Sequence, residues 1–280
     1  MQLCRHGPEH IKRVAIPQFN NLRKLTLTQG NVLDKDLAAL KRRPRLETLI
    51  VKAHFSGTGA FLGETVAYQN SLEHLEFEKA ENLNDAALLH LGKFENLGSF
   101  SLFLNHHVTG SGIASLQTCK NFTSLELQKC SAVTTLEGIA HLSRLRELTL
   151  YDMPALRDAA FECLNSLPQL KILRLAGIDI TEPQMQAISK IKSLEYLEIS
   201  VWQGANVNAL RLLVALPNLH SIYVTCNFAI STLISVLQTY PALVHLTIDR
   251  TLNEDERREI RTQLPNLQKL VTNPMAAKSS

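Results

Sequence analysis

Residues 72–95 read LEHLEFEKAENLNDAALLHLGKFE, and this stretch decides the fold. It opens with Leu72, Leu75 and Phe77, and the last two alternate with polar glutamates, which is the period-two pattern of a half-buried strand. Asn84 and Asp85 are residues that cap helices, and apolar residues at helical spacing follow them. The stretch therefore predicts a strand, a turn and a helix.

The opening pattern, Leu-x-x-Leu-x-Leu with conservative swaps, returns eleven times at steps of 23 to 26 residues. One compact core does not produce such a register, because a globular fold has no reason to repeat its apolar spacing. The sequence therefore predicts a single solenoid in which each repeat buries its face against its neighbours. The motifs begin at Leu22, Leu46, Leu72, Leu97, Phe122, Leu145, Leu170, Leu194, Leu219, Leu243 and Leu267.

The two ends of the repeat array look different from its middle. Residues 11–16 match the strand pattern but precede Leu22 by too few residues to hold a helix. We therefore expect residues 1–18 to form an N-terminal cap with a helix-less strand. We also expect other residues or a partner to cover the open edge of that strand. Residues 19–272 form the predicted repeat domain, and residues 273–280 are predicted to be a disordered tail.

With these motifs the chain resembles a leucine-rich repeat protein over residues 19–272. The order of elements in LEFEKAENLNDAALLHL and LTLYDMPALRDAAF is similar to the ribonuclease-inhibitor-like and cysteine-containing subclasses, which occur in F-box proteins. In the second subclass a cysteine packs into the turn after the strand, and Cys130 occupies that place here. The resemblance implies an α/β horseshoe of about 10–11 repeats, with a parallel sheet on the concave face and helices on the convex face.

Side chains alternate across a strand, so the residues flanking the second and third Leu of each motif should point into the concavity. Four glutamates make an acidic stretch there, and four aromatic residues stand among them, which is the composition of interface hot spots. We expect a basic or mixed protein surface to dock across repeats four to nine; the alternative is that Tyr and Phe only fill strands well. The predicted partner-binding residues are Lys52, His74, Glu76, Glu78, Phe103, Glu126, Glu147, Tyr151, Arg174, Tyr196, Glu198 and Tyr223.

Composition excludes several other classes. The net charge is +3 from 29 basic and 26 acidic residues, and the charges are interspersed along the chain, which argues against a nucleic-acid or membrane partner. The chain shows no apolar stretch of signal-peptide or membrane-span length. We therefore expect a monomer in the cytoplasm, with the nucleus or a host cytosol as alternatives. The cysteines are odd in number and include no Cys-x-x-Cys pair, which favours a reducing compartment. They are Cys4, Cys119, Cys130, Cys163 and Cys226.

Several short motifs imitate catalytic or binding sites. Residues 57–63, GTGAFLG, resemble a phosphate-binding loop, but the spacing is one residue too long, and we interpret them as a longer turn. His106 and His107 lack metal-ligand partners at suitable spacing, and Cys163 lies among apolar helix residues. We interpret Trp202 either as a contact at the edge of the binding surface or as a buried side chain in the place of the motif cysteine. We predict no enzyme, no cofactor and no metal site.

Three functions agree with this sequence. The first is a non-catalytic scaffold that binds a protein partner on the concave face. The second is a substrate-recognition subunit of a ubiquitin ligase, although the roughly 20 residues before the first full repeat are too few for an F-box. The third is a bacterial secreted effector that uses its repeats to bind a host protein.

Overall fold

Each of the eleven motifs forms a strand, and all of the strands join one parallel sheet. The computed structural model describes residues 2–3, 21–43, 45–64, 66–200, 207–225 and 229–272. Within these ranges the strands are β1 (Gln2–Leu3), β2 (Lys24–Leu27), β3 (Asn31–Val32), β4 (Thr48–Phe55), β5 (His74–Lys79), β6 (Ser99–Asn105), β7 (Ser124–Cys130), β8 (Glu147–Tyr151), β9 (Ile172–Ala176), β10 (Tyr196–Ser200), β11 (Ser221–Val224), β12 (His245–Ile248) and β13 (Lys269–Thr272).

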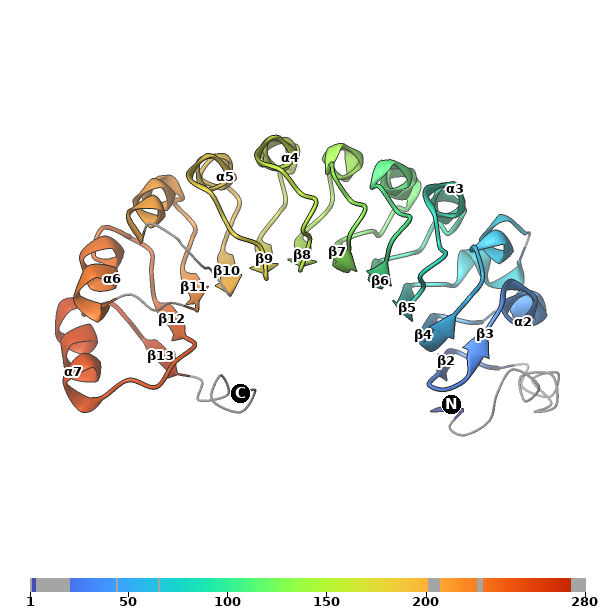
Figure 1. Ribbon diagram of the computed structural model, residues 1–280, viewed down its shortest axis with the longest axis horizontal. Helices are drawn as coiled ribbons and strands as arrows, with labels where there is room; N and C mark the ends of the chain where they lie inside the picture. The colour runs from blue at the N-terminus through green and yellow to red at the C-terminus, as the bar shows by residue number, and fades with distance from the viewer. Residues whose placement is uncertain are drawn as a thin grey trace.

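The strands stack in chain order, and equivalent leucines lie side by side. Leu148 pairs with Leu125 on one side and with Leu173 on the other, and the same register runs from β2 to β13. Figure 1 shows the result: the sheet lines the inside of an arch, and the helical segments form its outside. Helices are wider than the spacing between strands, so the array bends towards its sheet. The predicted leucine-rich repeat horseshoe is confirmed.

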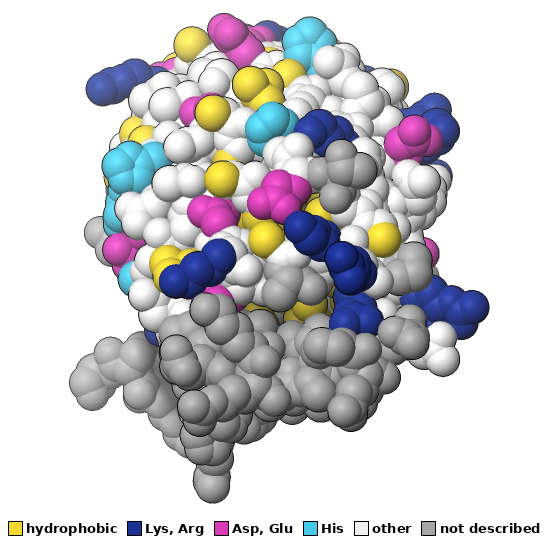
Figure 2. All heavy atoms as spheres, turned by 90° about the vertical axis from the view of Figure 1, so that its right-hand side faces the viewer, with side chains coloured by type: hydrophobic (Ala, Val, Ile, Leu, Met, Phe, Trp, Pro, Cys, Tyr) yellow, Lys and Arg dark blue, Asp and Glu magenta, His cyan; other side chains and the backbone are white. Residues whose placement is uncertain are grey.

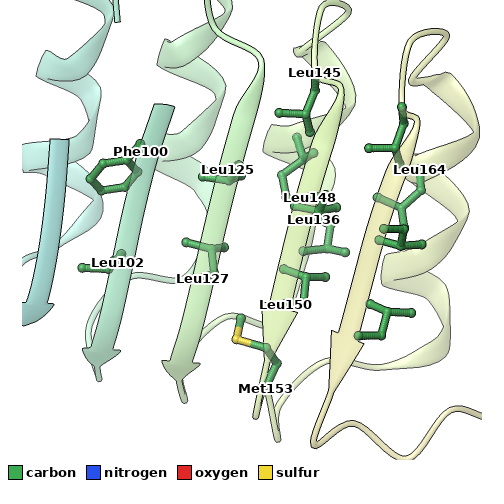
Figure 3. Close-up of a cluster of buried hydrophobic side chains, with 14 of the residues drawn as sticks. Phe100, Leu102, Leu125, Leu127, Leu136, Leu145, Leu148, Leu150, Met153 and Leu164 are labelled. Atoms are coloured by element: carbon green, nitrogen blue, oxygen red, sulfur yellow. The ribbon is translucent and has the colours of Figure 1, made fainter. Parts of the chain in front are cut away.

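The core is a continuous apolar layer between the sheet and the convex segments. The second and third leucines of each motif point into it, and Leu125, Leu127, Leu148 and Leu150 are fully buried. Figure 3 shows these side chains in neighbouring strands, with Leu136 reaching the same layer from the turn that follows β7. Each repeat therefore buries its leucines against the repeats before and after it, as a solenoid requires.

The convex side is made of short segments, and many of them are 3-10 rather than α-helical. A repeat of about 24 residues leaves few residues after the strand and its turns, so several segments tighten into 3-10 geometry. In the part of the chain that the structure describes, the α-helices are α2 (Asp34–Ala38), α3 (Asp85–Leu88), α4 (Asp158–Glu162), α5 (Glu182–Ile188), α6 (Ile230–Leu237) and α7 (Glu254–Gln263). The 3-10 helices of this part are η2 (Ala39–Arg42), η3 (Ala60–Gly63), η4 (Ala67–Asn70), η5 (Leu89–Lys93), η6 (Ser111–Thr118), η7 (Glu137–His141), η8 (Cys163–Ser166) and η9 (Val207–Ala215).

Glycine allows two of these segments, η6 and η7, to lie close to the preceding repeat. A side chain on Gly112 would lie 2.6 Å from the carbonyl oxygen of Asp85, and one on Gly138 would lie 2.6 Å from that of Gly110. The absence of a Cβ therefore lets η6 and η7 approach the backbone of the preceding repeat. A helical pattern in the sequence does not reveal this tightening, which explains why the sequence predicts ordinary helices there.

The helix cap predicted at Asn84 is present, and α5 and α7 also begin with side-chain caps. The side chain of Asn84 accepts a hydrogen bond from the N–H of Ala87 at the start of α3. Thr181 and Gln184 form a capping box at the start of α5, and Asn253 and Glu256 form one at the start of α7. Each side chain satisfies a backbone donor that the first turn of a helix leaves without an intrahelical partner.

Two consecutive repeats hold a buried side chain at the same position at the end of the strand, Asn105 in one and Cys130 in the next. Asn105 is fully buried, and its Nδ2 donates to the carbonyl oxygens of Ala80 (2.6 Å) and Leu83 (2.8 Å). Its Oδ1 accepts from the N–H groups of His107 (2.9 Å) and Val108 (2.7 Å). Cys130 stands beside it in register and is also fully buried, as predicted from the motif.

At the N-terminal end, Gln2 and Leu3 pair with Thr26 and Leu27 of β2. The helix-less strand predicted at residues 11–16 lies outside the described residues, as do Trp202 and the predicted tail. At the other end α7 turns only Ile260 fully inward and presents charged side chains to solvent. None of the helices in the described ranges has both the length and the apolar character needed to cross a membrane.

Candidate partner-binding face

The sheet brings all twelve predicted partner-binding residues to its concave face. They lie on strands β4 to β11, at positions that alternate with the buried leucines. Lys52 is exposed, and the other eleven are partly exposed. We call the side chains of β2 and β4 to β13 that alternate with the buried leucines the inner face, which leaves out the exposed Lys79 and Lys129 near the ends of β5 and β7. From β4 to β10 its ion-paired residues form two clusters, with a less charged region between them.

The first cluster joins β4, β5 and β6. Lys52 forms ion pairs with Glu78 and, at 3.6 Å, with Glu76. The Nε2 of His74 lies 3.3 Å from Oε2 of Glu76, and its Nδ1 shares a hydrogen bond of 2.5 Å with the hydroxyl of Ser99. The hydrogen bond from His74 lowers the pKa of Glu76, with help from Lys52 and against the effect of burial. Two of the predicted acidic residues therefore share one cation, Lys52, within the face.

Ser99, His74 and Glu76 form a chain of hydrogen bonds that sequence reasoning missed, and its residue types are those of a serine hydrolase triad. Such a triad also needs N–H donors that stabilise an oxyanion. Here the N–H groups of Gly98 and Ser99 both donate to the carbonyl oxygen of Glu73 within the sheet. We therefore interpret the three side chains as a structural network.

The second cluster joins β8, β9 and β10. Arg174 forms ion pairs with Glu147 and, at 3.6 Å, with Glu198, and its guanidinium lies 5.3 Å from the centre of the Tyr196 ring. The Tyr196 hydroxyl donates to Glu198 at 3.0 Å. Burial and the neighbouring Glu198 raise the pKa of Tyr196 to about 12. Both predicted glutamates are again paired, and Tyr196 serves to position Arg174.

The remaining aromatic residues of the prediction lie between and beyond these clusters. Phe103 is on β6 and Tyr151 on β8, and both are in register with Gln128 on the strand between them. Neither ring has a hydrogen bond or ring contact within the residues that the structure describes. Tyr223 on β11 bonds with Asp249, and burial together with that bond raises the pKa of Tyr223 to about 12. Phe103 and Tyr151 are therefore the aromatic side chains least explained by the fold.

The motifs that imitate other sites have structural roles. The glycine-rich turn at 57–63 does hold an anion, but the anion is Asp34 of the preceding repeat, which accepts from the N–H groups of Thr58 (2.9 Å) and Phe61 (3.2 Å). His106 shares a hydrogen bond of 2.8 Å with Ser131. Cys163 packs against the core, and burial and Glu137 raise the pKa of its thiol to about 11, so it is not a ready nucleophile.

The N-terminal end carries a charge feature that the overall balance hides. Residues 21–45 contain seven basic and two acidic side chains, whereas the whole chain has a net charge of only +3. Lys35, Lys41 and Arg42 are exposed on α2 and η2 and make no ion pair with any described residue. Figure 2, which faces this end, shows Lys and Arg side chains gathered on it. Counting charges by repeat would have revealed this basic end.

No protein-family model matches the chain, and no curated protein matches its sequence. Its fold is shared with solved structures. An internalin (inlF) from Listeria monocytogenes is 20% identical with a TM-score of 0.55, over 92% of this chain and 76% of that chain. A chain of a TLR13–ssRNA13 complex is 19% identical with a TM-score of 0.55, over 91% of this chain but only 36% of that chain. With the geometry above, these likenesses show a leucine-rich repeat solenoid; the ribonuclease-inhibitor-like or cysteine-containing subclass stays a prediction.

Proposed function

We propose that this chain is a non-catalytic recognition module that binds a segment of another protein on its inner face. The observation that carries the proposal is the pair Phe103 and Tyr151, two partly exposed rings on a rigid sheet with no partner among the described residues. Rigid aromatic side chains bury much area at little entropic cost, so they make effective anchors.

The two ion-paired clusters support this role. They fix the long side chains of Lys52 and Arg174 in place before any partner arrives. A face whose side chains are already ordered loses less conformational entropy on binding. From β5 to β11 the strands step about 4.8 Å each, so this part of the face spans about 29 Å, which an extended segment of about nine residues would cover.

The charge of the inner face favours a protein over a nucleic acid. From β4 to β10 it carries five carboxylates, on Glu76, Glu78, Glu126, Glu147 and Glu198, against the two cations already described. An excess of carboxylates repels a phosphate backbone. The TLR13 structure is of a complex with ssRNA, but this balance of charge makes a similar ligand unfavourable on the inner face of this chain.

Affinity capture with matched surface variants tests the proposal. The test variant replaces Phe103 and Tyr151 with Ala on the inner face. The control replaces Leu89 and Val214 with Ala, which are exposed large apolar residues on the described convex segments. We expect a partner captured by the wild type to be lost by the test variant and retained by the control. Retention of the partner by the test variant, or its loss by the control, would overturn the proposal.

The narrower roles predicted from the sequence use the same face. A substrate receptor of a ubiquitin ligase would co-purify with a cullin complex, and a secreted effector would bind a protein of the host. We also infer a reducing compartment, such as the cytoplasm, because Cys119, Cys130 and Cys163 are free thiols. Capture from a cytosolic extract is therefore the first experiment to perform.

A further inference from the structure

Glu126 differs from the other carboxylates at the centre of the inner face. Glu76 and Glu78 have Lys52 as a cation partner, and Glu147 and Glu198 have Arg174. Glu126 accepts only from neutral groups: the hydroxyl of Ser101 at 3.2 Å and the amide of Gln128 at 2.6 Å. No cation of the described residues lies within ion-pair distance of it. Its charge is therefore uncompensated on a half-buried surface.

Two unpartnered rings stand on either side of Gln128, which lies two residues further along β7 from this carboxylate. Phe103, Gln128 and Tyr151 form one row across β6, β7 and β8, and Glu126 lies on the same face of β7. Two strand spacings separate the rings by about 9.6 Å where they leave the sheet, so the midpoint lies about 4.8 Å from each. A cation interacts with an aromatic face when it lies within about 6 Å of the ring centre. The space above Gln128 thus suits a cation between two rings.

The same face already shows what occupies such a setting. Two strands further on, the Arg174 guanidinium is held by the carboxylates of Glu147 and Glu198 and lies 5.3 Å from the ring centre of Tyr196. Glu126 with Phe103 and Tyr151 offers the corresponding partners, a carboxylate and aromatic rings, but none of the described residues supplies a cation there. The setting beside Tyr196 is therefore occupied by a cation of this chain, Arg174, whereas the setting at Glu126 holds no cation from the described residues.

We propose that Glu126, Phe103, Gln128 and Tyr151 form a cation slot that receives a basic side chain of the bound protein segment. The inference rests on the proposed function and names the chemistry of its anchor residue. Each oxygen of Glu126 accepts one hydrogen bond and retains a lone pair for another. Arginine fits better than lysine, because its flat guanidinium stacks on rings and donates to a carboxylate through two N–H groups.

Selection from a random linear peptide library displayed on phage tests the slot. The wild type, Glu126→Gln and Glu195→Gln are selected in parallel; Glu195 is a matched control because it is an ion-paired carboxylate outside the inner face. We expect the wild type and Glu195→Gln to enrich peptides with one fixed arginine or lysine. Glu126→Gln should bind such a peptide about tenfold more weakly, which corresponds to one lost charge-assisted hydrogen bond.

A second variant fills the slot from within the chain. Gln128→Arg places a guanidinium between the rings and beside Glu126, so it should block the selected peptide while circular dichroism and thermal unfolding show an intact fold. If peptides are enriched without a fixed basic residue, or bind Glu126→Gln and Gln128→Arg as tightly as the wild type, the cation slot is overturned and inner-face recognition stands. If the wild type enriches no peptide, the proposed function fails as well.

Discussion

Asp85 accepts both the N–H and the hydroxyl of Thr109, each at 2.8 Å, so the first residue of α3 is bonded to the next repeat. Gly112 adds a third bond to the same carboxylate, at 2.8 Å. Asp34 bonds the next repeat in the same way through Thr58, and Asp158 accepts from the hydroxyl of Thr181 at 2.9 Å. Carboxylates at the starts of convex helices therefore tie neighbouring repeats together.

Replacing Asp85 with Asn should destabilise the solenoid in a pH-dependent way. Burial raises the pKa of Asp85, but the hydrogen bonds from Gly112, Thr109 and Gly110 outweigh it and hold the pKa below its ordinary value. A carboxyl with a depressed folded pKa stabilises the fold above its unfolded pKa of about 3.9, and this stabilisation is lost as the pH falls through the folded value. We expect Asp85→Asn to lower the free energy of unfolding at pH 7 by about 1–2 kcal/mol, measured with urea.

The matched control is Asp255→Asn, whose carboxyl is 91% exposed on α7. It should change the free energy of unfolding by less than about 0.5 kcal/mol at every pH. The difference between the wild type and Asp85→Asn should shrink below about pH 4, because the unfolded wild-type chain then binds a proton at Asp85 that the folded chain binds only at lower pH. A difference that stays constant with pH would show that Asp85 does not act through its charge.

Replacing Asn105 with Ala should be costly, because the substitution leaves two buried carbonyl oxygens, the buried N–H of Val108 and the part-buried N–H of His107 without their present partner. We expect the free energy of unfolding to fall by about 2–4 kcal/mol. Asn105→Cys should cost less than Asn105→Ala, since a cysteine already fills the equivalent place at Cys130. Asn82→Ala is the control, because Asn82 is exposed and donates one bond, to Ser56 at 3.3 Å. Equal losses for Asn105→Ala and Asn82→Ala would contradict the argument.

The strands and their register could be predicted from the sequence, because a repeated apolar spacing has one solution: equivalent leucines stacked side by side. Leu148 beside Leu173 follows from that spacing alone. The convex side could not be predicted in detail, since an apolar helical pattern does not distinguish α-helix from 3-10 helix. Contacts with a neighbouring repeat, such as those that Gly112 and Gly138 permit, are not visible in such a pattern.

The positions of the inner-face residues could be predicted from the sequence, but the ion pairs between them could not. Register places Thr149 beside Arg174, yet Arg174 reaches diagonally to Glu147, and this depends on its rotamer. The predicted acidic stretch therefore contains two ion-paired clusters, each with two carboxylates and one cation, and Glu126 lies between them. The basic end at residues 21–45 was predictable in principle, but a charge count over the whole chain averages it away.

Three consecutive repeats hold a non-glycine residue in the left-handed region at the same place, just after the third leucine. Leu104, Lys129 and Asp152 have φ of 54°, 52° and 52°, and the next repeat has Gly177 there with φ of 62°. Only glycine adopts this conformation without steric cost. We expect Lys129→Gly, at an exposed site, to raise the free energy of unfolding by about 0.5–1 kcal/mol, and Gly177→Ala to lower it by about 1 kcal/mol. Changes of the opposite sign in thermal unfolding would show that the turn relaxes.

The ion pair of Arg174 with Glu147 should be coupled more strongly than the pair of Lys171 with Glu195. Both pairs link neighbouring repeats, but Lys171 is 48% exposed whereas Arg174 is 34% exposed and has Tyr196 and Glu198 as further partners. Solvent screens exposed pairs to a coupling of about 0.2–1 kcal/mol. A second carboxylate and a ring face strengthen the first pair, because they hold the guanidinium in one geometry.

Double-mutant cycles with Gln at all four positions measure the difference. We expect a coupling energy of about 1 kcal/mol for Arg174 with Glu147, and less than about 0.5 kcal/mol for Lys171 with Glu195. Because salt screens exposed charges, the coupling of the second pair should vanish in about 1 M NaCl while part of the first remains. Equal couplings in both cycles would show that the inner-face cluster is no better ordered than a surface ion pair, and the argument that this face is arranged before binding would lose its support.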